Sequence, residues 1–305
     1  MGGGEEVTLK EDFFINLRGQ KIFTRSWVPQ HVKALVFVFH GLGEHCGREA
    51  YHFLSAKLNQ LNYAVFALDH YGHGRSEGER AYIPNFEHFA MDAWQYIDRV
   101  ATQFPSKLPR FVFGHSMGGS IALVTIKKRP RFFAGVAMTS PAVQKGEDIS
   151  FATILAARSI AKIAPRTPIQ GVDPSHVSRD PEVVKKYVED PLVFHGKMAA
   201  KTGLTLLQTV EDIEKNAASW VQIPILICQA GEDKLVNPSG AKNLYDKIKH
   251  EKKELKWYEG VYHELLHEPE REQVLNDIVT WMEDTYKEKI RAQSNDNNKK
   301  AKARL

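Results

Sequence analysis

Short strand-like runs alternate with helix-like segments along most of this chain, and this alternation constrains the fold more than any other feature. The runs occupy residues 34–39, 63–68, 110–113, 133–138, 223–229 and 254–258. Most are continuous apolar stretches, which are typical of strands buried on both faces. Segments with helical spacing, such as residues 86–103, separate them. Strand and helix in alternation predict βαβ units and a mostly parallel, doubly wound sheet.

The alternation stops between residues 143 and 217, where proline-separated helical segments replace the strands. We therefore predict an α/β core formed by residues 1–142 and 218–290, with residues 143–217 inserted as a helical cap. Residues 291–305 lack apolar periodicity, which predicts a disordered basic tail.

Charge and cysteine content exclude several classes of protein. The tail holds five basic residues and one acidic residue, a difference of +4 that equals the net charge of the whole chain. The remainder is neutral, so no nucleic-acid partner is expected. Two cysteines, Cys46 and Cys228, are too few for a disulfide framework and suggest a reducing compartment. The first six residues lack the apolar stretch of a signal peptide.

The pattern G-x-S-x-G occurs twice, centred on Ser76 and on Ser116. A nucleophilic serine on an open α/β sheet needs a buried strand before it and a helix starting at it. Ser116 has both, since residues 110–113 lead into it and residues 117–124 follow as a helix. Ser76 has neither. Ser116 is therefore the predicted nucleophile, and the expected architecture is the α/β-hydrolase fold.

Acyl transfer also requires an oxyanion hole and a base held by an acid. The backbone N–H groups of Met117 and Leu42 are the candidate donors, Leu42 lying in the glycine-rich loop after the first apolar run. The order serine, acid, histidine points to Asp233 and His263, each just beyond a predicted strand. The nearest competitors are Glu232 for the acid and His267 for the base.

Residues 263–267 also match H-E-x-x-H, the zinc-binding motif of metalloproteases. That chemistry needs a stable helix, but Gly260 and Pro269 leave room for about one turn. We therefore expect no metal and no cofactor, and little effect on activity from replacing Glu264 by glutamine.

With these motifs in place, the chain resembles the monoacylglycerol lipase family of α/β-hydrolases over roughly residues 8–285. The resemblance is carried by residues 40–45, 69–80, 114–119 and 258–263. It implies hydrolysis of a monoacylglycerol to a fatty acid and glycerol. It also implies that Arg48, His115 and Tyr187 hold the glycerol end of the substrate, with Glu44 orienting Arg48. The role of His267 stays open.

A lipid substrate implies contact with a membrane surface. No Asp or Glu occurs between residues 149 and 172, where basic and apolar residues mix. This composition favours a cap helix near residues 150–166 that docks on an anionic membrane. We expect a cytoplasmic, peripherally membrane-associated enzyme. Lysophospholipase, general carboxylesterase and non-catalytic scaffold remain alternatives, and a homodimer is left open.

Overall fold

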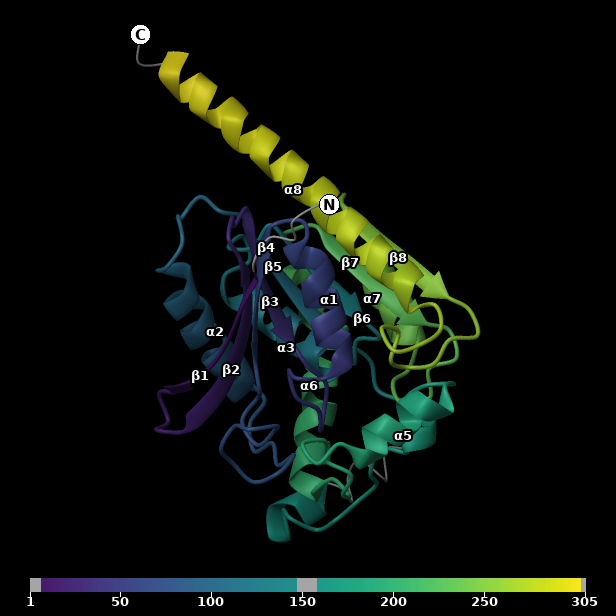
Figure 1. Ribbon diagram of the computed structural model, residues 1–305. Coiled ribbons are helices and arrows are strands. Elements are labelled where there is room, and N and C mark those ends of the chain that lie inside the picture. The colour runs from purple at the N-terminus through teal and green to yellow at the C-terminus, as the bar shows by residue number, and fades with distance from the viewer. Residues whose placement is uncertain (1–6, 147–157, 303–305) are drawn as a thin grey trace.

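The computed structural model describes residues 7–146 and 158–302, with side chains up to residue 295. Within these ranges eight strands form one sheet, in the order β1-β2-β4-β3-β5-β6-β7-β8 (Figure 1). The pairs β1–β2 and β2–β4 are antiparallel, and the other neighbours are parallel. The predicted α/β-hydrolase fold with a mostly parallel sheet is confirmed. The strands are β1 (Val7–Ile15), β2 (Lys21–Pro29), β3 (Ala34–Phe39), β4 (Tyr63–Leu68), β5 (Arg110–His115), β6 (Gly135–Thr139), β7 (Ile225–Ala230) and β8 (Lys253–Tyr258).

Helices cover both faces of the sheet, which is why every residue of β3, β4, β6 and β7 is buried. Helices α1 and α8 pack on one face, and α2, α3, α6 and α7 pack on the other (Figure 1). Their bounds are α1 (Glu49–Asn59), α2 (Glu87–Ala101), α3 (Met117–Lys128), α6 (Ala200–Trp220), α7 (Ser239–Lys247) and α8 (Arg271–Lys302). Each face thus has its own apolar core.

The N-terminal hairpin of β1 and β2 is absent from the predicted strands. β1 is an edge strand, and apolar side chains at odd-numbered positions of it are exposed, among them Val7, Leu9 and Ile15. A strand that buries little does not show the continuous apolar run by which the central strands were predicted.

Between β6 and β7 the described residues form helices with connecting loops. These are residues 158–163, η1 (Pro174–His176), α5 (Pro181–Glu189) and α6. The predicted boundary between cap and core at residue 217 falls inside α6. Ile213 and Ala217 are buried in the core on the α3 face of the sheet, so the second half of α6 belongs to the core. Residues 147–157 lie outside the described residues.

Helix α8 continues through Lys302 and projects beyond the body of the protein (Figure 1). The predicted disorder from residue 291 is therefore wrong for residues 291–302. No glycine or proline follows Arg271 to end the helix, and seven of residues 291–302 are Ala, Gln, Lys or Arg, which favour helix more than the Ser, Asn and Asp residues at 294–298 do. Its first half packs on the sheet, where Ile278 and Met282 are fully buried and Trp281 lies against Gly135. Across the described part of the chain, no helix has both the length and the apolarity to cross a bilayer.

Candidate active site

The turn between β5 and α3 carries Ser116 in a strained backbone conformation, with φ 55° and ψ −121°. Non-glycine residues rarely adopt positive φ, and such strain concentrates at functional sites. The turn is tight enough to require glycine on both sides. A Cβ atom on Gly114 would lie 2.3 Å from the carbonyl oxygen of Gly118, and one on Gly118 would lie 2.0 Å from that of Phe39. Ser116 therefore occupies the strand–turn–helix position that the sequence predicts.

The competing serine, Ser76, has a different environment. Its buried hydroxyl accepts a hydrogen bond from the Phe23 N–H at 2.9 Å and donates one to the Asp69 carbonyl at 2.6 Å. These bonds fasten the loop after β4 to strand β2. Ser76 thus holds a loop in place and has its hydrogen-bonding groups occupied.

Asp233 and His263 meet at the end of the sheet where β7 and β8 terminate. The His263 Nδ1 atom lies 2.7 Å from Asp233 Oδ2. The other carboxylate oxygen, Oδ1, accepts hydrogen bonds from the backbone N–H groups of Leu235 and Val236 at 2.9 and 3.0 Å. The carboxylate is therefore fixed in position and orients the imidazole through one ring nitrogen, which leaves the other nitrogen for chemistry.

The pair also shifts both pKa values. Burial alone would lower the pKa of His263, but attraction by Asp233 and the hydrogen bond to it outweigh burial and raise that pKa above 6.5. Burial would raise the pKa of Asp233, but the charge of His263 and the hydrogen bonds to the carboxylate lower it below 3.8. Asp233 is thus ionised at neutral pH, and His263 has the raised basicity of a proton acceptor.

The loop after β3 lies directly against the serine. A Cβ atom on Gly41 would be 3.2 Å from the Cβ atom of Ser116. His40 stabilises this loop, since its Nε2 atom accepts a hydrogen bond from the His70 N–H at 3.0 Å. The Gly43 carbonyl accepts a hydrogen bond from the Phe194 N–H at 2.8 Å, which links the loop to the segment between β6 and β7.

One cavity of about 490 Å³ brings most of the predicted residues together. Ser116, His263, Leu42 and Met117 all line it, as do Glu44 and Tyr187. Much of the remaining lining is apolar and comes from the segment between β6 and β7, including Val172, Met198, Leu206 and Val210. The cavity thus has Ser116 and His263 in one part of its lining and mostly apolar side chains in the rest.

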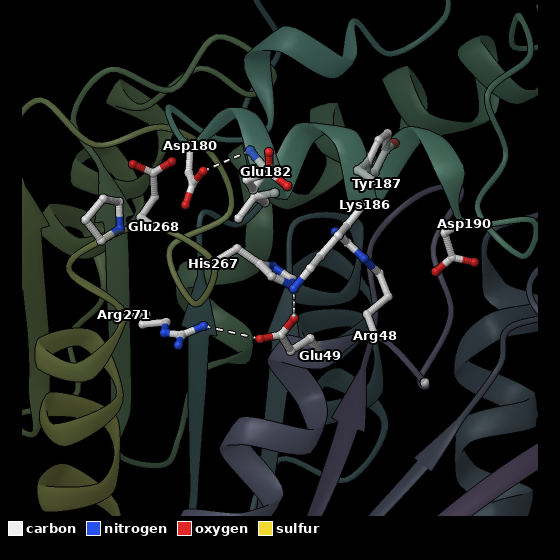
Figure 2. A pocket seen from close by; sticks show the side chains of 13 residues that line it. Arg48, Glu49, Asp180, Glu182, Lys186, Tyr187, Asp190, His267, Glu268 and Arg271 are labelled. Carbon is white, nitrogen blue, oxygen red and sulfur yellow. Dashed lines mark hydrogen bonds and ion pairs between the residues drawn. The ribbon is translucent and has the colours of Figure 1, made fainter.

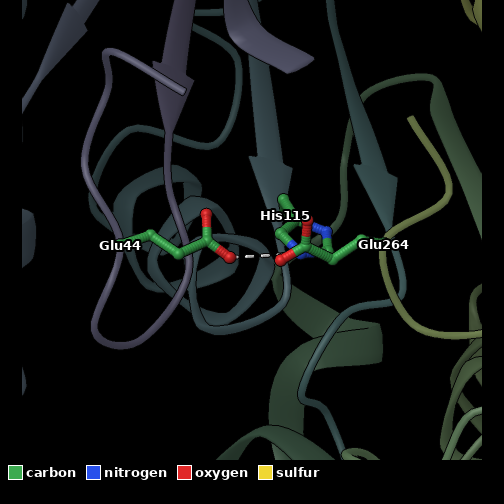
Figure 3. Close-up of side chains that lie close together, drawn as sticks. All are labelled: Glu44, His115 and Glu264. Carbon is green, nitrogen blue, oxygen red and sulfur yellow. Dashed lines mark ion pairs between the residues drawn. The ribbon is translucent and has the colours of Figure 1, made fainter. Parts of the chain in front are cut away.

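Beside the cavity, a buried ion-pair cluster surrounds Arg48. Its Nη1 atom lies 3.2 Å from Glu44 Oε1 and forms a second, shorter ion pair with Glu264. The Tyr187 ring lies 5.1 Å from the guanidinium. Burial would lower the pKa of Arg48, but Glu264 and Glu44 raise it, so the side chain stays charged. His115 faces both carboxylates, with its Nε2 atom 3.6 Å from Glu44 (Figure 3).

The sequence predicts no role for Glu264 in this site. The zinc motif that contains it would need a helix, but residues 265–267 form a turn. The Glu264 carboxylate is buried and pairs with Arg48 and with His267 Nδ1, the latter at 2.6 Å. Burial would raise the pKa of Glu264, but Arg48 and His267 hold it well below 4.5. No local pattern could reveal this contact, because 216 positions separate Glu264 from Arg48.

The ligand atoms of Glu44, His115 and Glu264 lie within 4.8 Å of one another, as a metal site would require (Figure 3). However, the Arg48 guanidinium already contacts both carboxylates. A divalent cation there would have to displace a buried positive charge, so these residues do not fit a metal ion.

A second, polar cavity of about 520 Å³ lies next to Arg48 (Figure 2). Arg48, Tyr187 and His267 line it, and Tyr187 lines the first cavity as well. The ion-pair cluster therefore forms part of the wall between an apolar cavity and a polar one.

Replacing Glu264 by glutamine is expected to destabilise the protein by about 3 kcal/mol, because a buried charge loses one of its partners. The expectation from the sequence, little effect of this change on activity, stays a separate prediction. Urea unfolding of both forms measures the loss. The control is Glu49→Gln. This change removes the half-exposed carboxylate that pairs with Lys186 and Arg271, and it should lower the free energy of unfolding by about 1 kcal/mol or less. Equal midpoints for Glu264→Gln and the parent protein would contradict the structural role.

Comparison with known proteins identifies the family to which the chain belongs. The family described as "Serine aminopeptidase, S33" matches residues 30–270. A monoacylglycerol lipase of Mycolicibacterium smegmatis is 34% identical, over 90% of this chain and 97% of that protein. The human monoglyceride lipase is 39% identical, over 88% of each chain. The crystal structure of a Paleococcus ferrophilus monoacylglycerol lipase superposes with a TM-score of 0.74 at 28% identity, covering 91% of this chain and 99% of that one. The chain belongs to the monoacylglycerol lipase family of α/β-hydrolases.

Proposed function

We propose that this protein hydrolyses monoacylglycerol to a fatty acid and glycerol through a Ser116–His263–Asp233 triad. The observation that carries the proposal is the single cavity in which a strained serine, a histidine held by a buried carboxylate and an apolar wall meet. Relatives named monoacylglycerol and monoglyceride lipase support the choice of substrate.

In the proposed mechanism, His263 takes the proton of Ser116 as the hydroxyl attacks the ester carbonyl. A bond forms between the Ser116 oxygen and the carbonyl carbon, and the N–H groups of Leu42 and Met117 stabilise the resulting oxyanion. His263 then protonates the departing glycerol oxygen as the ester bond breaks. Water, deprotonated by His263, then attacks the carbonyl carbon of the acyl-enzyme. The bond to the Ser116 oxygen breaks, His263 returns the proton to that oxygen, and the fatty acid is released.

The two ends of the cavity suit the two ends of a monoacylglycerol. The apolar wall would hold the acyl chain, and the polar cluster would hold the glycerol hydroxyls. Within that cluster we assign hydrogen bonding to Arg48, His115 and Tyr187, with Glu44 and Glu264 orienting the guanidinium. A neutral diol needs no charged partner, and the positive charge of Arg48 is already balanced by two carboxylates.

Hydrolysis rates for three esters test the substrate. Monooleoylglycerol should be cleaved with a higher kcat/KM than lysophosphatidylcholine, because a phosphate would meet the two buried carboxylates. A short nitrophenyl ester should also be cleaved. Its KM should be higher than that of monooleoylglycerol, because it has no long acyl chain to bind the apolar wall. Preference for lysophosphatidylcholine would instead establish the alternative, a lysophospholipase, and equal rates for all three would indicate a general carboxylesterase.

We further propose that residues between β6 and the middle of α6 act as a cap that docks on a membrane. The helical stretch at residues 158–163 exposes Ile160 and Ile163, the latter by 87%. Arg158 and Lys162 lie on the same stretch, as expected for a surface that meets anionic lipid. The docking segment is predicted near residues 150–166. Its first part, residues 150–157, lies outside the described residues. Two buried free cysteines agree with a cytoplasmic location.

Replacing Ile160 and Ile163 together by aspartate is expected to weaken binding to anionic vesicles by tenfold or more, since each change replaces inserted apolar area by a charge. Co-sedimentation with vesicles containing phosphatidylserine measures the binding. Hydrolysis of a soluble short-chain ester serves as control and should be unchanged. Equal losses in both assays would show that the two side chains support the cap and do not dock it.

A further inference from the structure

Phe86 lies between two cavities. The first, of about 490 Å³, is the one that Ser116 lines. The second, of about 390 Å³, is lined by residues at the start of α2, on α3 and on α6. Phe86 and Thr209 line both cavities, so these two residues form part of the wall between them.

Helix α3 shows where the second cavity lies relative to Ser116. Met117 and Ser120, in the first turn of α3, line the first cavity, and Val124 on the same face lines the second. With a rise of 1.5 Å per residue, Val124 lies about 12 Å from Ser116 along the helix axis. The second cavity is therefore displaced from the nucleophile toward the far end of α3.

Helix α6 presents a different face to each cavity. Leu206 and Val210 line the first cavity, and Thr205 and Gln208 line the second. Successive residues of a helix are about 100° apart, which places Thr209 between these two faces. The Thr209 hydroxyl donates to the Thr205 carbonyl at 2.8 Å, so its hydrogen is already bonded within the helix.

The first cavity has a charged mouth and a buried apolar end. Asp173 and Lys234, which line it, are exposed to solvent and mark the mouth. Phe86 and Met117 are only 5% and 2% exposed and mark the buried end. An acyl chain gains most at the buried end, because there its methylene groups exchange water for apolar contacts.

The lining of the second cavity is polar and reaches solvent. Asn85, Gln208 and Asp212 line it and are exposed. Glu87 lines it as well and forms an ion pair with Lys128 at 2.9 Å. A hydrocarbon chain that passed the wall would meet charge and water, so the apolar part of the substrate site ends at the wall.

We propose that Phe86 determines the length of acyl chain that the enzyme accepts, by closing the buried end of the Ser116 cavity, with Thr209 as a second part of the same wall. This inference rests on the proposed function, since it concerns the acyl chain of the substrate. The parent protein should show a kcat/KM that rises with chain length, because each buried methylene adds roughly fourfold to binding. The rise should end at the chain whose terminal methyl group reaches Phe86.

Competition between substrates tests the proposal. Monoacylglycerols from octanoyl to docosanoyl are mixed in one detergent micelle, and mass spectrometry of the released fatty acids gives their relative kcat/KM. Phe86→Leu shortens the side chain in the wall and should move the optimum to longer chains. The ratio of long-chain to octanoyl hydrolysis should rise on the order of tenfold. Thr209→Phe adds bulk to the same wall and should move the optimum to shorter chains.

Phe89→Leu is the matched control. The Phe89 ring packs on Phe86 at 5.5 Å between centroids and is buried in the same core, but Phe89 lines neither cavity. This variant should keep the parent optimum, and hydrolysis of a short nitrophenyl ester shows that each variant is folded. An unchanged optimum in both Phe86→Leu and Thr209→Phe, or an equal shift in Phe89→Leu, would overturn the proposal.

Failure of the proposed function would look different. If monoacylglycerols were not cleaved at all, the proposed substrate would be wrong. Nitrophenyl esters of the same acyl chains would then still test the wall, because they need the acyl cavity but no glycerol subsite. The same shifts with this second series would support the role of Phe86, and unshifted profiles would refute it.

Discussion

Replacing Ser116 by alanine is expected to lower ester hydrolysis by about 10³-fold or more, because no acyl-enzyme can form without the hydroxyl. The substitution removes one half-buried oxygen atom, so the fold should be retained. Initial rates with a nitrophenyl ester, together with labelling by a fluorophosphonate probe, measure the effect. Labelling should disappear together with activity.

Ser76→Ala is the matched control, since Ser76 occupies the other G-x-S-x-G pattern. It loses the hydrogen bonds to Phe23 and Asp69, so we expect a loss of stability of about 1–3 kcal/mol. Activity per folded molecule and fluorophosphonate labelling should remain. If Ser76→Ala abolished labelling and Ser116→Ala did not, the assignment of the nucleophile would be wrong.

Replacing Asp233 by asparagine is expected to lower kcat by about 10⁴-fold, because an amide can donate to His263 and stabilise the wrong tautomer. The pH profile should also change. The base must be neutral to act, so in the parent protein activity falls as pH drops through the raised pKa of His263, above 6.5. Without the Asp233 charge, the pKa of His263 falls relative to the parent protein, so the acid limb of the residual activity moves to lower pH.

Steady-state rates between pH 5 and 9 measure both effects. Glu232→Gln is the control, because the neighbouring carboxylate is exposed and does not contact His263 in the structure. Its rate and profile should match those of the parent protein. An unchanged acid limb in Asp233→Asn would show that another group sets the basicity of His263.

The sequence predicts the central sheet and the positions of the candidate triad residues because both depend on local signals. Continuous apolar runs mark β3 to β7, since a strand covered on both faces tolerates few polar residues. Ser116 and Asp233 follow such strands, His263 follows the partly exposed β8, and parallel strands end at one edge of the sheet. The sequence thus predicts that Ser116, Asp233 and His263 lie at one edge of the sheet, and in the structure His263 contacts Asp233.

Other features depend on contacts that no local pattern records. The partner of Glu264 is Arg48, on a distant loop, and only folding brings the two together. β1 buries few of its side chains, so its sequence lacks the apolar pattern by which a strand is predicted. Helix α6 crosses the predicted boundary between cap and core because its two halves pack against different surroundings. Residues 291–302 extend α8, a helix that is stabilised by the packing of Ile278 and Met282 in its first half.

The position of α8 has a consequence for how the chain folds during synthesis. All eight strands are translated before α8, the helix that covers one face of the central strands near Trp281 and Met282. Until α8 has been synthesised, the apolar residues that it covers are exposed to solvent in the nascent chain. Acquisition of the native state is therefore a late event, and nascent chains that stop before Arg271 should be bound by chaperones or degraded rather than released as a smaller active enzyme.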